Sequence, residues 1–123
     1  VMSLYSKVAL IKKIKAGDRV GYGLTYTADE DEYLATIPIG YADGLIRKNQ
    51  GRNVYINGKY FEIVGRVCMD QIMVRVDETI KEGDKVEIFG AHISLASMAR
   101  ELETIPYEII CLITKRVDRL YIK

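Results

Sequence analysis

Several kinds of residue are scarce in this chain of 123 amino acids, and each scarcity excludes a class of protein. It has no tryptophan and two prolines, and 18 lysines and arginines are nearly balanced by 17 aspartates and glutamates. Nucleic-acid-binding proteins usually carry a clustered basic excess. Lys12, Lys13 and Lys15 could form a basic patch, but we interpret them as exposed lysines of an edge strand. An apolar fraction of 49% predicts a folded domain with a hydrophobic core, spanning residues 1–123.

Cysteine, histidine and long hydrophobic runs are scarce too. Cys68 and Cys111 lie far apart and form no CxxC pair, so neither a metal site nor a disulfide framework is predicted. The single histidine, His92, has no carboxylate or nucleophile partner visible in the sequence, and we interpret it as a loop residue. No apolar run approaches the roughly 18 residues that span a bilayer, and there is no signal-peptide pattern. We expect a cytoplasmic protein, and a chain that is a piece of something longer.

Short segments rich in β-branched and aromatic residues recur along the chain, separated by turns that contain glycine. Asn57-Gly58 joins two of them and is the strongest short-range signal for a β-hairpin. One helix is predicted after Ser94 as N-cap, with apolar residues at i, i+3, i+4 and i+7 from Leu95. The pattern predicts a mainly β fold, a small β-barrel or Greek-key-like domain with one short α-helix near the C-terminus. The predicted strands are 8–14, 19–22, 25–27, 33–39, 53–56, 59–64, 67–69, 72–76, 85–89, 107–113 and 117–122.

Two tyrosines lie between glycines, in Gly21-Tyr22-Gly23 and Gly40-Tyr41-Ala42-Asp43-Gly44. Flanking glycines allow unusual backbone dihedrals and the close approach of a ligand. A phenol titrates near pH ~10, so a tyrosine that acts as a base at neutral pH needs a neighbour that lowers its pKa. The third unusual loop is Cys68-Met69-Asp70-Gln71. A purely structural interpretation stays open, because Asp43 before Gly44 is ordinary turn chemistry and Met69 can simply pack.

Taken in order, three segments resemble the C-terminal domain of alanine racemase. They are residues 20–28, 37–44 and 64–71, and the later residues 105–108 and 116–117 fit the same pattern. The resemblance implies a homodimer of two-domain subunits that depends on pyridoxal 5'-phosphate (PLP). An N-terminal (β/α)₈ barrel, absent from this chain, would carry the lysine that binds PLP. The C-terminal β domain would reach the active site of the other subunit, where PLP acts as the electron sink.

The resemblance also implies roles for individual residues. Tyr22 would be the base for L-alanine on one face of the substrate, and the barrel lysine would serve the other face. The backbone N–H of Met69 would hold the substrate carboxylate, and Tyr107 would contact the cofactor phosphate. Tyr41 and Asp70 would line a narrow mouth that admits small amino acids. The whole enzyme would supply D-alanine for the bacterial cell wall, use no metal, and be inactive as this fragment alone.

Two alternatives stay open. One is the racemase domain of a serine or broad-specificity enzyme, because a hydroxyl adds little volume and a tolerant pocket rejects it poorly. The other is a non-catalytic β-barrel module that binds a partner protein or nucleic acid, against which the near-neutral charge weighs. Leu112 and Asp118 depart from the family pattern, which often has a basic residue and a proline there. We expect both to lie on terminal strands, away from the motif loops.

Overall fold

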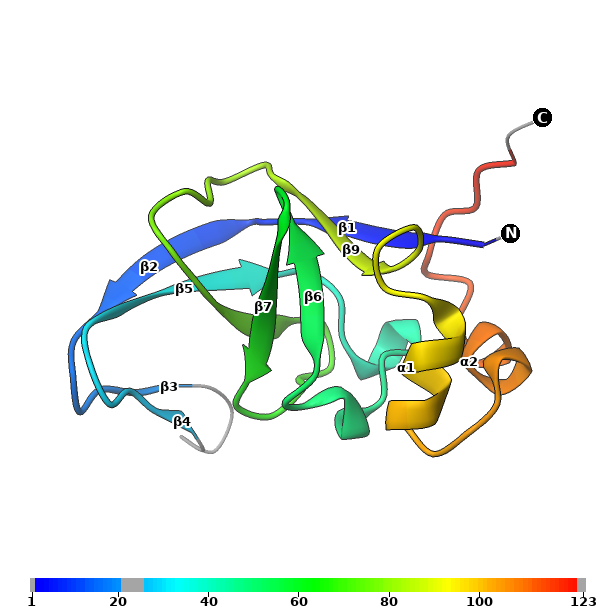
Figure 1. Cartoon of the computed structure of the whole chain (residues 1–123), viewed down its shortest axis with the longest axis horizontal. Helices are drawn as coiled ribbons and strands as arrows, with labels where there is room; N and C mark the ends of the chain where they lie inside the picture. The colour runs from blue at the N-terminus through cyan, green and yellow to red at the C-terminus, as the bar shows by residue number, and fades with distance from the viewer. Residues whose placement is uncertain (1, 21–25, 122–123) are drawn as a thin grey trace.

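The computed structural model describes residues 2–20 and 26–121, and within them the chain is mainly β (Figure 1). Two short 3₁₀ helices, η2 (Tyr41–Asp43) and η3 (Arg47–Asn49), and two α-helices, α1 (Leu95–Glu101) and α2 (Pro106–Leu112), accompany the strands. The strands are β1 (Leu4–Lys7), β2 (Leu10–Ile14), β3 (Arg19–Val20), β4 (Tyr26–Thr27), β5 (Glu32–Ile37), β6 (Asn53–Ile56), β7 (Lys59–Val64), β8 (Ile72–Val76) and β9 (Lys85–Phe89).

Seven strands form one antiparallel sheet in the order β1-β9-β6-β7-β8-β5-β2. The two edges of this sheet, β1 and β2, are consecutive in sequence and joined only by Val8 and Ala9. Val8 N–H donates to the Asp84 carbonyl at 2.9 Å, and Ala9 N–H donates to the Thr36 carbonyl at 2.9 Å. The connection is therefore hydrogen-bonded toward both edges, and the sheet curls into a barrel-like shape (Figure 1). The predicted mainly β, barrel-like fold is confirmed.

Alternating side chains of the strands fill the inside of the curl. In β8, Ile72 and Val74 are fully buried, whereas Arg75 between Val74 and Val76 is exposed. This alternation is what a strand with one buried face requires. Strand β5, next to the edge strand β2, is buried on both faces, as its apolar run predicts, because Leu34 packs in a second, smaller cluster outside the main core. That cluster contains Ile14, Ala28, Leu34 and Val64.

Local turn and edge predictions are confirmed in several places. Asn57 and Gly58 take positive φ values of 48° and 85°, and they join β6 and β7 in the expected hairpin. Strand β2 is an edge strand, and its Lys12 and Lys13 are exposed. Helix α1 begins after Ser94, whose Oγ accepts a hydrogen bond from Ser97 N–H at 3.0 Å.

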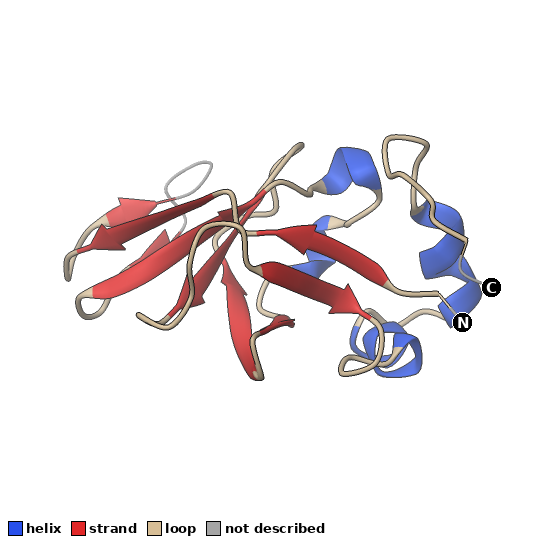
Figure 2. Cartoon of the chain, turned by 90° about the horizontal axis from the view of Figure 1, so that it is seen from above, coloured by secondary structure: helices blue, strands red, loops and turns tan. Residues whose placement is uncertain are grey.

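The C-terminal third of the chain differs from the prediction. Residues 107–113, predicted as a strand, form helix α2, so two α-helices lie near the C-terminus instead of one. Pro106 occupies the first helical turn, where its fixed φ favours a helix, and Ile109 and Ile113 are buried one turn apart. Both helices lie at the same end of the curled sheet (Figure 2). Within residues 2–20 and 26–121, no helix is long and apolar enough to cross a membrane.

Two further strand predictions are wrong. Residues 67–69 turn instead of pairing, and Cys68 N–H bonds to the carbonyl of Gln71 at 3.0 Å. In the predicted strand 117–122, the described residues 117–121 lie outside any strand, and Leu120 and Tyr121 are 89% and 88% exposed. Short apolar runs are compatible with strands, helices and exposed segments alike, so periodicity alone could not separate them.

Candidate active site

The turn that carries Tyr41 lies directly against the loop that carries Met69. Tyr41 N–H donates to the Cys68 carbonyl at 3.0 Å, and Ala42 N–H donates to the Met69 carbonyl at 3.0 Å. A Cβ at Gly40 would lie only 2.1 Å from the Cys68 carbonyl oxygen. Glycine is therefore required at position 40 by the close approach of two backbones, and the two loops form one rigid unit.

Asp43 fixes the turn from within. Its carboxylate accepts a hydrogen bond from Gly40 N–H at 2.9 Å, and its side chain is buried. Gly44 follows with a φ of 110°, and a Cβ there would lie 2.3 Å from the Leu112 carbonyl oxygen. Thr114 N–H donates to the Asp43 carbonyl at 3.1 Å. The turn is thus held between the 68–71 loop and the end of α2, and the expectation that Leu112 lies on a terminal strand away from the motif loops is wrong.

Arg116 connects the same two loops through its side chain. Its Nη2 lies 2.6 Å from Asp70 Oδ1, and its Nε lies 3.2 Å from Asp43 Oδ1. The hydrogen bond to Asp70, followed by the charge of Asp43, raises the pKa of Arg116. The sequence analysis did not assign Arg116 a role, although residues 116–117 fit the family pattern. Only the fold reveals that one guanidinium spans both loops.

A hollow of about 300 Å³ lies beside Tyr41. The guanidinium of Arg47 lies 5.3 Å from the centre of the Tyr41 ring, a cation–π arrangement that restrains both side chains. Tyr41 and Met69 are both exposed at this hollow. The structure therefore brings together two of the predicted site residues, Tyr41 and Met69, while Asp70 follows Met69 on the same loop and pairs with Arg116. The residues that line the hollow are Tyr41, Arg47, Val67, Cys68 and Met69.

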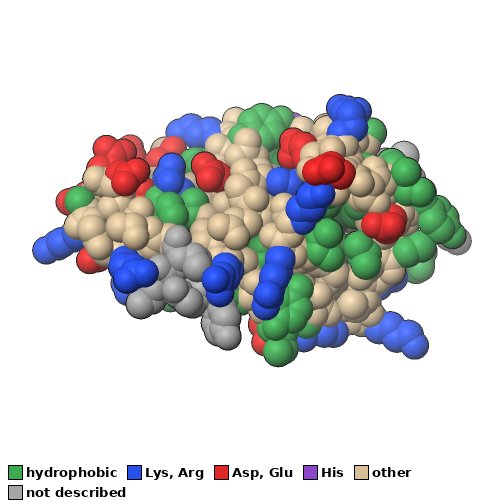
Figure 3. All heavy atoms as spheres, turned by 90° about the horizontal axis from the view of Figure 1, so that it is seen from below, with side chains coloured by type: hydrophobic (Ala, Val, Ile, Leu, Met, Phe, Trp, Pro, Cys, Tyr) green, Lys and Arg blue, Asp and Glu red, His purple; other side chains and the backbone are tan. Residues whose placement is uncertain are grey.

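Tyr107 and Tyr22 stand apart from this group. Tyr107 lies on the first turn of α2, at the opposite end of that helix from Leu112, and its side chain is 72% exposed. Ile105 nearby is exposed as well, and Figure 3 shows hydrophobic side chains gathered at the helical end of the molecule. Tyr22 lies outside the described residues.

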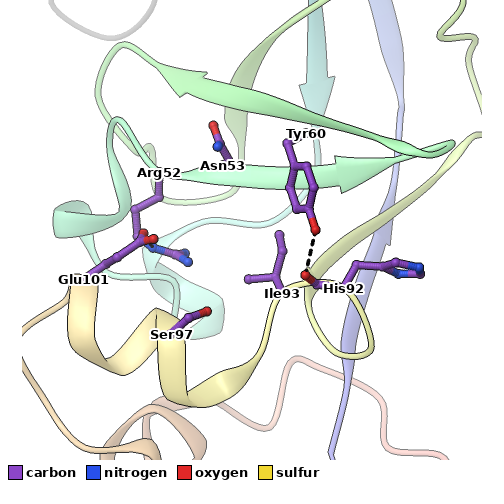
Figure 4. Close-up of a pocket in the computed structure, with 7 residues that line it drawn as sticks. All are labelled: Arg52, Asn53, Tyr60, His92, Ile93, Ser97 and Glu101. Carbon is purple, nitrogen blue, oxygen red and sulfur yellow. Dashed lines mark hydrogen bonds and ion pairs between the residues drawn. The ribbon is translucent and has the colours of Figure 1, made fainter.

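A second hollow of about 120 Å³ lies between β6, β7 and α1 (Figure 4). Arg52 is buried in its wall, and its Nε pairs with Glu101 Oε2 at 2.7 Å. Tyr60 donates from its hydroxyl to the His92 carbonyl at 2.9 Å. Because these polar groups bind to one another across the hollow, we interpret it as a structural contact between the sheet and α1.

His92 does have the carboxylate partner that the sequence analysis found missing. Its Nδ1 lies 3.0 Å from Glu87 Oε1, and its ring stacks on Tyr55 at 3.8 Å between centroids. Glu87 on β9 precedes His92 by five residues, so the pairing depends on the turn that follows β9. Within residues 2–20 and 26–121, no cluster of three or more His, Cys, Asp or Glu side chains could hold a metal ion. Both cysteines are free.

Comparison with known proteins decides the family. The family model described as "Alanine racemase, C-terminal domain" matches residues 1–121. The chain belongs to this family. Alanine racemase from Ligilactobacillus salivarius (strain UCC118) is 48% identical over 124 residues, which cover 98% of this chain and 33% of that protein. The chain thus spans about a third of the length of such relatives.

Solved structures of alanine racemases have the same fold over this chain. Alanine racemase from Bacillus anthracis with bound L-Ala-P superposes with a TM-score of 0.95 at 44% identity, covering 98% of this chain and 32% of that chain. Alanine racemase from Bartonella henselae with covalently bound pyridoxal phosphate gives a TM-score of 0.91 at 38% identity, covering 98% and 34%. The predicted resemblance to the C-terminal domain of alanine racemase is confirmed.

Proposed function

We propose that this chain is the C-terminal part of a PLP-dependent alanine racemase that interconverts L- and D-alanine. The family match over nearly the whole chain carries the proposal. The joined Tyr41 and Met69 loops support it, because they line a hollow of a size suited to a small ligand. The rest of the enzyme supplies the N-terminal barrel with its PLP-binding lysine. The working form is a cytoplasmic homodimer that provides D-alanine for the cell wall.

PLP, when bound, supplies an electron sink for the electron pair left after the substrate Cα–H is removed. The residues of this chain fit such a group. Tyr107 exposes its hydroxyl on the first turn of α2, where it can donate to a phosphate oxygen brought by another part of the enzyme. We assign Tyr107 to the cofactor phosphate on this basis.

Met69 is suited to hold the substrate carboxylate with its backbone. Its carbonyl is used by Ala42, and among residues 2–20 and 26–121 its N–H has no acceptor. An N–H that is held on a rigid loop and left unpaired is a ready donor to a carboxylate. Tyr41 and Asp70 flank this position and limit the size of the substrate. The side chain of Met69 has no part in the proposed contact.

Tyr22 acts as the base that removes the proton from L-alanine, and the barrel lysine acts on the opposite face. A base on each face is required because inversion removes the proton on one side and returns it on the other. The pKa of the Tyr22 phenol must be lowered by groups outside this chain, since a phenol ordinarily titrates near ~10.

The test uses Tyr22→Phe in the full-length enzyme, with racemisation followed by circular dichroism. We expect a loss of ~100-fold or more, the scale of general-base catalysis. L-alanine deuterated at Cα should show a larger isotope effect, whereas the isotope effect for D-alanine should not rise. Unchanged racemisation would favour the non-catalytic binding module. Alanine and serine assayed side by side distinguish the substrate preference, and the isolated chain with PLP and alanine should be inactive.

A further inference from the structure

Strands β3 and β4 form a small hairpin that is separate from the seven-stranded sheet. Arg19 pairs with Thr27 and Val20 pairs with Tyr26, and these ladders join the hairpin strands only to each other. The hairpin is inserted between β2 and β5, which are neighbours in the large sheet. Among residues 2–20 and 26–121 no strand ladder connects the two sheets, so side-chain contacts help to fix the angle of the hairpin against the large sheet.

One of these side-chain contacts is apolar. Tyr26 of β4 packs against the smaller cluster, which lies on the outer face of the sheet and includes Leu34 and Val64. Ala28, just after β4, is itself buried in that cluster. This apolar contact keeps the hairpin against the large sheet. Because it is non-directional, it does not fix the position of the hairpin along the sheet surface.

The other contact is polar and directional. The Tyr26 hydroxyl donates a hydrogen bond to Glu32 Oε1 of β5. Arg75 of β8 donates to the same hydroxyl from Nε at 3.0 Å and from Nη2 at 2.5 Å, and its Nε lies 3.2 Å from Glu32 Oε2. The Glu32 side chain is only 9% exposed. Three elements therefore meet at one phenol oxygen in a fixed arrangement.

The protonation state of Tyr26 suits this task. Burial, followed by the hydrogen bond to Glu32, raises the pKa of Tyr26. The phenol therefore keeps its proton at neutral pH and can donate it to Glu32, while the charges of Glu32 and Arg75 offset each other. This is the opposite of what a catalytic base needs, so Tyr26 is suited to hold a geometry.

We propose that Tyr26, Glu32 and Arg75 form a positioning cluster for Tyr22 in the racemase reaction. This inference rests on the proposed function. The cluster fixes β4 at Tyr26, and β4 is paired with β3 at Val20, so both strand ends that flank residues 21–25 are set against the large sheet. A base displaced by about 1 Å can lose ~100-fold in rate, so fixing the strands on either side of residues 21–25 has kinetic value.

The test compares Tyr26→Phe with Tyr60→Phe in the full-length, PLP-loaded enzyme. Both variants delete one phenol oxygen that takes part in hydrogen bonds, but Tyr60 lies on β7 and bonds to the His92 carbonyl. We expect Tyr26→Phe to lower racemisation by ~10-fold or more, while Tyr60→Phe stays near wild type. Glu32→Gln and Arg75→Lys should give intermediate losses. If Tyr26→Phe does not fold, the racemisation rates of Glu32→Gln and Arg75→Lys test the proposal instead.

Isotope effects separate positioning of the base from general damage to the fold. If Tyr22 is misplaced, removal of the proton from L-alanine becomes more rate-limiting, so the deuterium effect for L-alanine rises and that for D-alanine does not. A merely structural loss would lower the melting temperature and leave both isotope effects unchanged, and that result would overturn the inference. If Tyr22→Phe also lacks the asymmetric effect, the proposed function fails. If Tyr22→Phe has it and the cluster variants do not, only this inference fails.

Discussion

Asp70 Oδ1 lies 2.6 Å from Arg116 Nη2, and this contact ties an exposed loop to the chain segment that follows α2. Asp70 directly follows Met69 in the sequence, so the contact also restrains the backbone N–H that we assign to the substrate carboxylate. A charge-assisted contact of this length gives direction as well as attraction. The loop is therefore fixed on one side by the turn of Tyr41 and on the other by Arg116.

Arg116→Met in the full-length enzyme should weaken substrate binding. We expect the KM for alanine to rise roughly 5- to 10-fold with a smaller change in kcat, because a carboxylate contact stabilises ground and transition states alike. Steady-state kinetics measure both constants. Arg100→Met is the matched control, since Arg100 is an exposed arginine on the last turn of α1. Equal KM values for the two variants would contradict the role of Arg116.

Gly40→Ala should destabilise the domain far more than Gly51→Ala. The added methyl group at position 40 would meet the Cys68 and Met69 carbonyl oxygens at 2.1 and 2.4 Å, although its φ of −151° suits any residue. Overpacking costs about 3 kcal/mol or more when backbone must move. Position 51 has open space and only a positive φ, at a cost of about 1 kcal/mol. Chemical denaturation gives both values, and equal losses would refute the close approach.

Glu87 should make stability depend on acid pH. Burial alone would raise the pKa of Glu87, but hydrogen bonds from the His92 ring and from the backbone N–H groups of Ile93 and His92 outweigh it, so the pKa is lowered. A carboxyl whose pKa is lowered by folding contributes stability that is present above its ordinary value of 4.5 and lost as the pH falls through the folded value.

Melting temperatures from pH 7 to pH 3 test this dependence. Glu87→Gln should melt lower than wild type at pH 7 and lose less on acidification, because it has no charge to neutralise. Glu78→Gln, an exposed position after β8, is the control and should follow wild type. If the melting temperatures of Glu87→Gln and wild type fall by the same amount from pH 7 to pH 3, Glu87 is not the group responsible for the loss of stability in acid.

The isolated chain should self-associate. Its helical end exposes Ile105 and Tyr107, and the segment after α2 exposes Leu120 and Tyr121. Large exposed apolar patches mark surfaces that another protein part covers. Sedimentation velocity should show a weight-average mass that rises with concentration. A monodisperse monomer at high concentration would contradict this expectation, and Tyr107→Ser should shift the chain toward monomer.

The strands were largely predictable because their signals are local. The Asn57-Gly58 turn and the alternation in β8 follow from backbone geometry and from one buried face. Helix α2 was missed because residues 107–113 contain a short apolar run that suits a strand as well as a helix, and the proline before it does not by itself show that a helix begins there. The start of a helix is decided by what packs against it.

The candidate site was predictable only in part. The order of the motifs pointed to Tyr41, Met69 and Asp70, and the structure packs the turn of Tyr41 against the loop of Met69; the roles of these residues stay predictions. Arg116 and the Tyr26 cluster were missed because each depends on a partner more than 40 residues away, Asp70 for Arg116 and Arg75 for Tyr26, and the pairing of β5 with β8 brings Glu32 and Arg75 close. Tertiary contacts of this kind leave no periodic signal.

The two edges of the large sheet belong to one bent stretch of chain, and this has a consequence for how the protein is made. Leu4 must find Phe89 before the curl can close. During synthesis β1 leaves the ribosome well before β9 is made. Early folding intermediates therefore have an unpaired strand edge that can associate with other chains. The sheet can close only after β9 has been made, and this pairing of strands far apart in sequence favours slow folding.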